Sequence, residues 1–232
     1  NQKPNETRLD LVQKNAKIMA DVVTQIKEQG YKGILLIVSN PVDIMTQVAM
    51  EVSGFPEHRV FGSGTVLDSA RLRYHLGQHL GVDSRSVHAF VIGEHGDSEI
   101  AAWSSANVSG VPLNSFCEMR GHFNHEGNTE SIEEQVKNSA YEIIAKKDAT
   151  YYGIAMVVKR ICQAIVRDEK SIFPISLRMH GEYALEDVVL SMPAIVGARG
   201  IETTIPISLD EKEVSRLHES AEMLRETRKE IR

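Results

Sequence analysis

The stretch VIGEHGDSE, from Val91 to Glu99, carries a histidine among glycines and acids, a combination suited to acid–base chemistry. The imidazole of His95 changes charge near neutral pH, so it can donate or accept a proton once a carboxylate orients it. Glu94 and Asp97 are the nearest acids along the chain, and the glycines leave room for a ligand. A lone histidine at a strand end is more often a structural residue, so the catalytic interpretation depends on the acids around it.

A second group of charged residues lies in TVLDSARLRYHLG, whose apolar spacing predicts a helix over 65–80. Asp68 and Arg71 are three residues apart and share one face of this helix, which by itself predicts only an ordinary ion pair. Asp68 is nevertheless a better partner for His95 than the local acids. Arg71 suits a carboxylate ligand, because a guanidinium donates two parallel hydrogen bonds. Arg73 lies about 200° around the helix from Arg71 and faces elsewhere.

The string NPVD follows an apolar run, GILLIVSN, that is typical of a strand in a parallel sheet. Asn40 therefore stands at the carboxyl end of a strand, which is where open α/β sheets bind ligands. An asparagine before a proline is equally a common turn former, and this alternative stays open.

Helical and strand-like patterns alternate through the first half of the chain, which predicts an α/β fold. The last third instead predicts an antiparallel meander, in FPISLRM, DVVLSMPAIVG and IETTIPISL. SVHAFVIG is read as one further strand, and RVFGSG as a short one. The helices are expected over 9–29, 43–52, 65–80, 131–168 with a break near Gly153, and 210–231 with Asp210 as N-cap and Glu213 completing a capping box.

Composition excludes several classes of protein. A net charge of −6 and a pI near 5.9 disfavour a non-specific nucleic-acid binder, which needs a basic face. No apolar run is long enough for a membrane span. Two cysteines form neither a disulfide framework nor a CxxC pair, so a reducing cytoplasm is expected. The chain begins on a polar stretch without methionine, which predicts a partial chain.

Four motifs together resemble one family: NQKPNETR, VSNPVD, GSGTVLDSARLR and IGEHGDSE occur in the order found in bacterial L-lactate dehydrogenases. The resemblance runs from Asn1 to the C-terminal helix. It implies NAD as cofactor and the C-terminal half of a Rossmann-type parallel sheet over 1–62, followed by a mixed α+β substrate domain over 63–232. The family's glycine-rich pyrophosphate turn and ribose-binding acid belong before Asn1, and GSGTVL lacks the third glycine of that turn.

The resemblance assigns catalytic roles to three side chains. His95 would exchange a proton with the substrate oxygen, and Asp68 would stabilise its protonated ring. A neighbouring carboxylate raises a histidine pKa by roughly one to three units. Arg8, on the opening loop, would polarise the substrate carbonyl, although an arginine in a polar loop is normally solvated.

The resemblance also assigns the substrate contacts. Arg71 would bind the carboxylate of pyruvate or L-lactate, and Asn40 would touch the substrate oxygen. Gln2 stands where malate-specific relatives carry arginine, which favours pyruvate over oxaloacetate. Thr150 would line the same end of the pocket.

The expected cofactor contacts lie at two strand ends and one helix. Val38, Ser39 and Asn40 would lie under the nicotinamide ribose. Ser63 would contact the carboxamide, and Ile154 would form the apolar wall behind the ring.

A second anion site is expected at Arg73 and His88, which match the residues that bind fructose 1,6-bisphosphate, an activator, in some bacterial members. The plain alternative is a solvated arginine and a strand histidine. The resemblance further implies a homotetramer.

Two other classes remain open at this point. His75 and His79 stand at i and i+4 on one helix, as metal ligands can, but no HExxH glutamate accompanies them. We expect no metal. An inactive fragment or binding protein is the other alternative.

Overall fold

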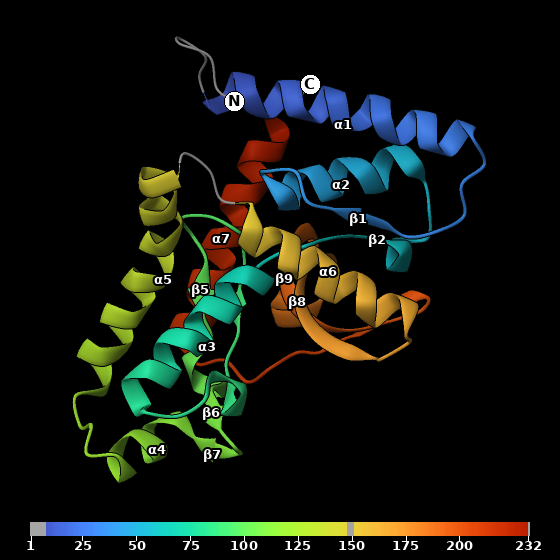
Figure 1. Ribbon diagram of the computed structural model, residues 1–232. Coiled ribbons are helices and arrows are strands. Elements are labelled where there is room, and N and C mark those ends of the chain that lie inside the picture. Colours follow the sequence, from blue (N-terminus) through green and yellow to red (C-terminus); the bar gives the residue numbers. More distant parts are fainter. Residues whose placement is uncertain (1–7, 148–150, 232) are drawn as a thin grey trace.

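The computed structural model describes residues 8–147 and 151–231, with backbone alone at 8–10 and 140–147. Within these residues, the largest sheet has the strand order β1-β2-β8-β9-β10 (Figure 1). Its strands are β1 (Leu35–Ile37), β2 (Val60–Gly62), β8 (Ser171–His180), β9 (Glu186–Gly197) and β10 (Gly200–Thr204).

Helices cover this sheet and continue into a second, smaller lobe around α3, α4 and α5 (Figure 1). The helices are α1 (Arg8–Glu28), α2 (Val42–Ser53), α3 (Val66–Leu80), α4 (Leu113–Met119), α5 (His125–Lys147), α6 (Tyr152–Val166) and α7 (Glu211–Lys229). Short 3₁₀ turns occur at Glu57–Arg59, Ser84–Ser86, Trp103–Ser105 and Glu182–Ala184.

The sheet combines a parallel part with an antiparallel part. β1 and β2 pair in parallel, and α2 forms the crossover between them. β8, β9 and β10 form the expected antiparallel meander. β2 joins the two parts where Gly62 pairs with Ser176 in antiparallel sense. The α/β prediction is therefore confirmed, with the parallel strands preceding the meander in the chain.

Glycines make this junction possible. A Cβ at Gly62 would lie 2.5 Å from the Thr46 hydroxyl, and one at Gly64 would lie 2.7 Å from the carbonyl oxygen of Pro174. Gly64 also has a φ of 50°. The glycines of RVFGSG thus allow β2 and the start of α3 to pack closely against β8.

Two strand predictions need correction. The run GILLIVSN forms a strand over three residues only, β1, in which Leu35 and Ile37 are buried and Leu36 is half-buried against the larger core. SVHAFVIG is two strands, because its halves pair with different partners. β3 (Val87–His88) pairs with β6 (Asn107–Val108), which also pairs with β7 (Val111–Pro112), whereas β4 (Val91–Ile92) pairs with β5 (Ile100–Ala101).

The expected helices are present, although α5 begins at His125 instead of residue 131 and α4 was not predicted. The long pattern over 131–168 is divided between α5 and α6, as the break near Gly153 predicts. The side chain of Asp210 accepts a hydrogen bond from the backbone of Glu213, and the reciprocal bond completes the capping box of α7.

Two apolar cores hold the lobes together. The larger surrounds β8 and β9 and includes side chains of α2, α6 and α7. The smaller lies between α3, α4, α5 and the short strands, with Leu72, Leu76 and Leu80 of α3 at its centre. Asp68 stands one turn before Leu72 in this row and is likewise buried.

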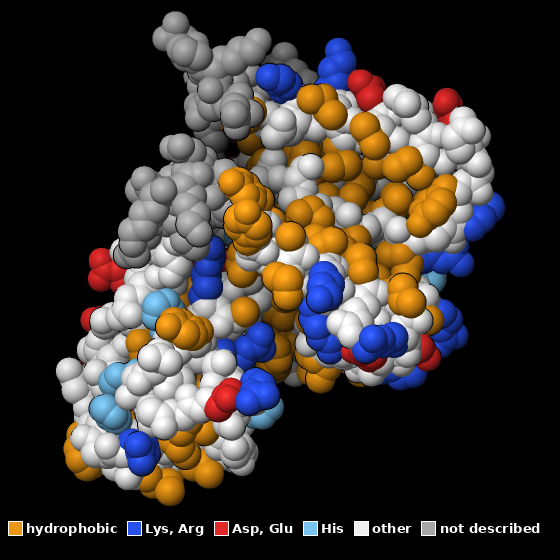
Figure 2. Space-filling view, in the orientation of Figure 1, with side chains coloured by type: hydrophobic (Ala, Val, Ile, Leu, Met, Phe, Trp, Pro, Cys, Tyr) orange, Lys and Arg blue, Asp and Glu red, His pale blue; other side chains and the backbone are white. Residues whose placement is uncertain are grey.

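Apolar side chains also gather on one outer face, over α1, α6 and the region of β1 (Figure 2). Exposed members include Ile18, Val22, Val38, Met156 and Val166. In the described part of the chain, no helix is both long and apolar enough to cross a membrane.

Candidate active site

The loop that carries His95 is held from two sides. Gly93 exchanges two backbone hydrogen bonds with Ser191 of β9, at 2.9 and 2.8 Å. The next residue, Glu94, donates its backbone N–H to the hydroxyl of Ser220 on α7 at 2.8 Å. Gly93 has a φ of 84°, and a Cβ there would lie 2.9 Å from that hydroxyl. The histidine loop is thus fixed between the meander and the last helix.

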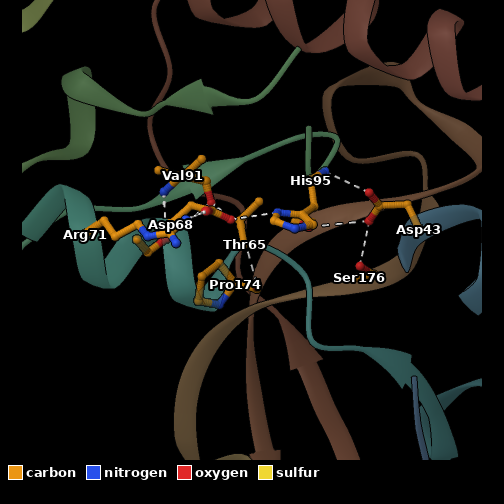
Figure 3. Close-up of polar contacts among 10 residues, drawn as sticks. Asp43, Thr65, Asp68, Arg71, Val91, His95, Pro174 and Ser176 are labelled. Atoms are coloured by element: carbon orange, nitrogen blue, oxygen red, sulfur yellow. Dashed lines mark hydrogen bonds and ion pairs between the residues drawn. The ribbon is translucent and has the colours of Figure 1, made fainter. Parts of the chain in front are cut away.

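The ring of His95 lies against the acid predicted for it. Nδ1 of His95 is 2.7 Å from Oδ2 of Asp68, and Nη1 of Arg71 donates to Oδ1 of Asp68 at 3.0 Å (Figure 3). Asp68 is buried, whereas the His95 and Arg71 side chains are 28% and 15% exposed. One carboxylate therefore orients both the acid–base group and the guanidinium.

Local hydrogen bonds place α3 so that Asp68 meets the ring. The hydroxyl of Thr65 donates to the carbonyl of Val91 at 2.5 Å, and the Val91 N–H donates to the Ser69 hydroxyl at 2.8 Å (Figure 3). These bonds tie the first turn of α3 to β4, two residues before the histidine loop begins.

The charge of His95 is set by competing effects. Burial opposes the protonated ring, but the hydrogen bond and charge of Asp68, together with the charges of Asp43 and Glu99, raise the pKa of His95 to about 9. Burial likewise opposes ionisation of Asp68, yet the hydrogen bond and charge of His95 and the nearby Arg71 lower its pKa below the usual value. At neutral pH the pair is an imidazolium beside a carboxylate.

A second acid meets the other side of His95 and was not predicted. Asp43 of α2 accepts the His95 backbone N–H at 2.8 Å and the Ser176 hydroxyl at 2.6 Å (Figure 3). Burial, only partly offset by these bonds, raises the pKa of Asp43 to about 6. The quoted motif NPVD contains this residue, but sequence spacing gave no sign that it would reach a loop 52 residues away.

These side chains surround a cavity of about 200 Å³. Its lining comes from four parts of the chain: Asn40, Asp68, Arg71, His95, Gly96, Asp97, Glu99, Val136 and Lys137. Pockets for drug-sized ligands are typically roughly 300–1,000 Å³, so this one suits a much smaller molecule. A basic clamp, a protonated ring and a small volume together suit a small organic anion. Glu99, Val136 and Lys137 were not predicted.

Five other residues expected in binding sites are not among the described residues that line this cavity. Gln2 and Thr150 fall outside the described residues. Arg8 begins α1 instead of lying on a loop, which corrects that expectation, and its side chain is not described. Arg73 is half-buried and does not line the cavity, as its angle on α3 predicts, and His88 is exposed on β3.

The two histidines considered as metal ligands have other contacts. His75 lies 3.4 Å from the hydroxyl of Ser139 on α5. The ring of His79 packs against that of His122, with centroids 4.2 Å apart. These contacts join α3 to α5 and to the segment after α4.

Comparison with known families identifies the fold around this site. Residues 1–62 match the NAD binding domain of lactate/malate dehydrogenases, and residues 65–232 match the alpha/beta C-terminal domain of the same enzymes. The chain belongs to the lactate/malate dehydrogenase family. It is accordingly an oxidoreductase that uses NAD, as the sequence motifs predict.

Relatives within the family are similar over most of this chain. It is 48% identical to an L-lactate dehydrogenase of Acetivibrio thermocellus, over 97% of this chain and 71% of the relative. It is also 48% identical to L-lactate dehydrogenase 1 of Lactococcus lactis subsp. lactis, over 97% and 69%. The structure of a minor L-lactate dehydrogenase from Enterococcus mundtii, in its ligands-bound form, superposes with a TM-score of 0.96 at 43% identity, covering 100% of this chain and 74% of that one.

The dehydrogenase offers suitable groups for a nicotinamide at the carboxyl ends of β1 and β2. Val38, Ser39 and Asn40 are exposed there, and the N–H of Ser63 donates to the Ile37 carbonyl at 2.8 Å. An exposed apolar side chain beside amide and hydroxyl groups fits a planar ring that carries a carboxamide. Ile154, on α6, is half-buried.

Proposed function

We propose that this dehydrogenase interconverts pyruvate and L-lactate with NADH and NAD. The observation that carries the proposal is the gathering of His95, Asp68 and Arg71 around one small cavity. The names of its relatives supply the substrate class.

The proposed mechanism gives each side chain one task. Arg71 binds the substrate carboxylate through its guanidinium and so fixes the orientation of the anion. The protonated ring of His95 donates to the carbonyl oxygen during reduction and accepts the proton during oxidation. Asp68 orients the ring and stabilises its imidazolium form. Bound NADH supplies the hydride.

Four further residues complete the proposed substrate and catalytic contacts. Arg8 would polarise the carbonyl as negative charge develops on its oxygen, and Asn40, which lines the cavity, would contact the same oxygen. Gln2 and Thr150 would line the end of the pocket that receives the third carbon of the substrate.

The cofactor contacts are proposed at the two strand ends and on α6. Val38, Ser39 and Asn40 would hold the nicotinamide ribose, Ser63 the carboxamide, and Ile154 the apolar side of the ring.

The proposal is tested by comparing initial rates with pyruvate and oxaloacetate, using the complete natural polypeptide that contains this sequence. We expect kcat/KM to favour pyruvate by about a hundredfold or more, because a second substrate carboxylate would be buried beside Gln2 without a cationic partner. Equal or better use of oxaloacetate would contradict the substrate assignment.

We propose that Arg73 and His88 bind fructose 1,6-bisphosphate as an activator. Burial lowers the pKa of the Arg73 guanidinium from its usual value, yet the group stays cationic, as an anion site requires. We expect Arg73→Gln to abolish activation while leaving turnover at saturating pyruvate unchanged. Initial rates with and without the sugar bisphosphate measure this, and undiminished activation of the variant would refute the site.

We propose a domain division at residues 62 and 63, supported by the change from parallel to antiparallel pairing at Gly62. A homotetramer in the cytoplasm follows from the resemblance. The free thiols of Cys117 and Cys162 suit such a reducing compartment.

A further inference from the structure

Glu99 is an acid of the cavity lining to which the proposed mechanism gives no role. Its backbone N–H donates to the Gly96 carbonyl at 3.2 Å, and its own carbonyl accepts from Arg216 of α7 at 3.4 Å. The side chain lines the cavity beside His95 and is 6% exposed. Glu99 is therefore held in place by its backbone, with its carboxyl group turned to the site.

The carboxyl group lies close to the catalytic pair. Donor or acceptor atoms of Glu99, Asp68 and His95 all lie within 4.8 Å of one another. Two buried carboxylates this close repel each other, so one of them tends to keep its proton. Asp68 already has Arg71 and His95 as partners, which leaves Glu99 as the acid that stays neutral. Burial, and then the charge of Asp68, raise the pKa of Glu99 to about 8 against the opposing effect of His95, Lys137 and Arg71.

The nearby cations are shared with other acids. On α5, Lys137 lies 3.6 Å from Glu133, and Glu133 also pairs with Arg216 of α7. On α3, Arg71 pairs with Asp68. On its own segment, Glu99 follows His95 and Asp97, which line the same cavity. Among the described residues, each cation near Glu99 is therefore paired with another acid.

We propose that Glu99 is a positioning residue that controls how Arg71 binds the substrate anion. While Glu99 is protonated, the guanidinium is available to the substrate carboxylate. Once Glu99 ionises, its negative charge competes for Arg71 and repels the substrate. This inference rests on the proposed reaction. It predicts that Glu99 weakens substrate binding at alkaline pH.

The size of the effect follows from Coulomb's law. A carboxylate a few ångströms from a bound anion, at an effective dielectric constant of about 20, weakens binding by roughly tenfold to a hundredfold. The effect is absent well below pH 8, where Glu99 is neutral, and is fully present well above it.

The decisive variant is Glu99→Gln, which mimics the protonated acid at every pH. At pH 6.5 we expect its KM for pyruvate to equal that of the wild type within about twofold. At pH 9.5 we expect its KM for L-lactate to be at least about tenfold lower than that of the wild type. Lactate is the right substrate at high pH, because its oxidation requires the neutral form of His95.

Two further variants separate charge from structure. Glu99→Asp keeps an ionisable carboxyl group and should keep the alkaline loss of lactate binding. Glu94→Gln removes another buried acid of the same loop, whose carboxylate contacts Ser98 and does not line the cavity. The ratio of its KM for L-lactate at pH 9.5 to its KM for pyruvate at pH 6.5 should match that of the wild type.

Equal lactate KM values for the wild type and Glu99→Gln at pH 9.5 would overturn the proposal. So would a pyruvate KM raised more than about tenfold in Glu99→Gln at pH 6.5, since an ionised Glu99 would then be aiding binding. Failure of the wild type to turn over pyruvate would instead refute the reaction on which the inference rests.

Discussion

We expect His95→Asn to lower kcat for pyruvate reduction by roughly a hundredfold to ten-thousandfold, the loss typical of removing a general acid. Asparagine can retain a hydrogen bond to Asp68 but cannot deliver a proton to the carbonyl oxygen. Steady-state rates with saturating NADH and pyruvate measure the loss. A rate near that of the wild type would refute the catalytic assignment.

The pH profile gives this variant a second readout. Because the pKa of His95 is about 9, proton donation in the wild type should decline as pH rises through that value. His95→Asn should lack this decline. His180→Asn is a matched control, because His180 is an exposed histidine at the end of β8 that contacts Glu57 and does not line the cavity. It should keep both the rate and the pH profile.

We expect Arg71→Gln to lower kcat/KM for pyruvate by roughly a hundredfold to several thousandfold. The variant would leave the substrate carboxylate in a largely buried cavity without its cation, a loss of about 3–5 kcal/mol. Asp68 would lose its 3.0 Å partner at the same time. Initial rates over a range of pyruvate concentrations measure the change.

Arg71→Lys tests whether charge or geometry matters at this residue. Lysine restores the charge but not the planar pair of donors, so we expect only part of the loss to be recovered. Arg85→Gln is the control, since Arg85 is a highly exposed arginine paired with Asp83 outside the cavity. Wild-type kcat/KM in Arg71→Gln would contradict the role of Arg71 in binding the carboxylate.

Local sequence patterns predicted the elements that carry the site. The apolar spacing of α3 placed Asp68 and Arg71 on one face and Arg73 on another, because helical geometry alone sets those angles. Turn signals and β-branched runs predicted the meander, and the Asp210–Glu213 spacing predicted the capping box of α7. Each of these predictions depends on residues close together in the chain.

Features that depend on distant residues were missed. The split of SVHAFVIG follows from its two pairing partners, β6 and β5, which lie further along the chain. Asp43 reaches the His95 backbone only because α2 packs against β8 and β9. Glu99 stands in a quoted motif, but its closeness to Asp68 depends on how β4 and α3 meet. Such contacts leave no periodic trace in the sequence.

The bond between Glu94 and Ser220 spans 126 residues of chain. The position of the acid–base group therefore depends on a helix near the other end of the chain. A change that loosens α7 would release this loop and disturb His95 without touching the cavity.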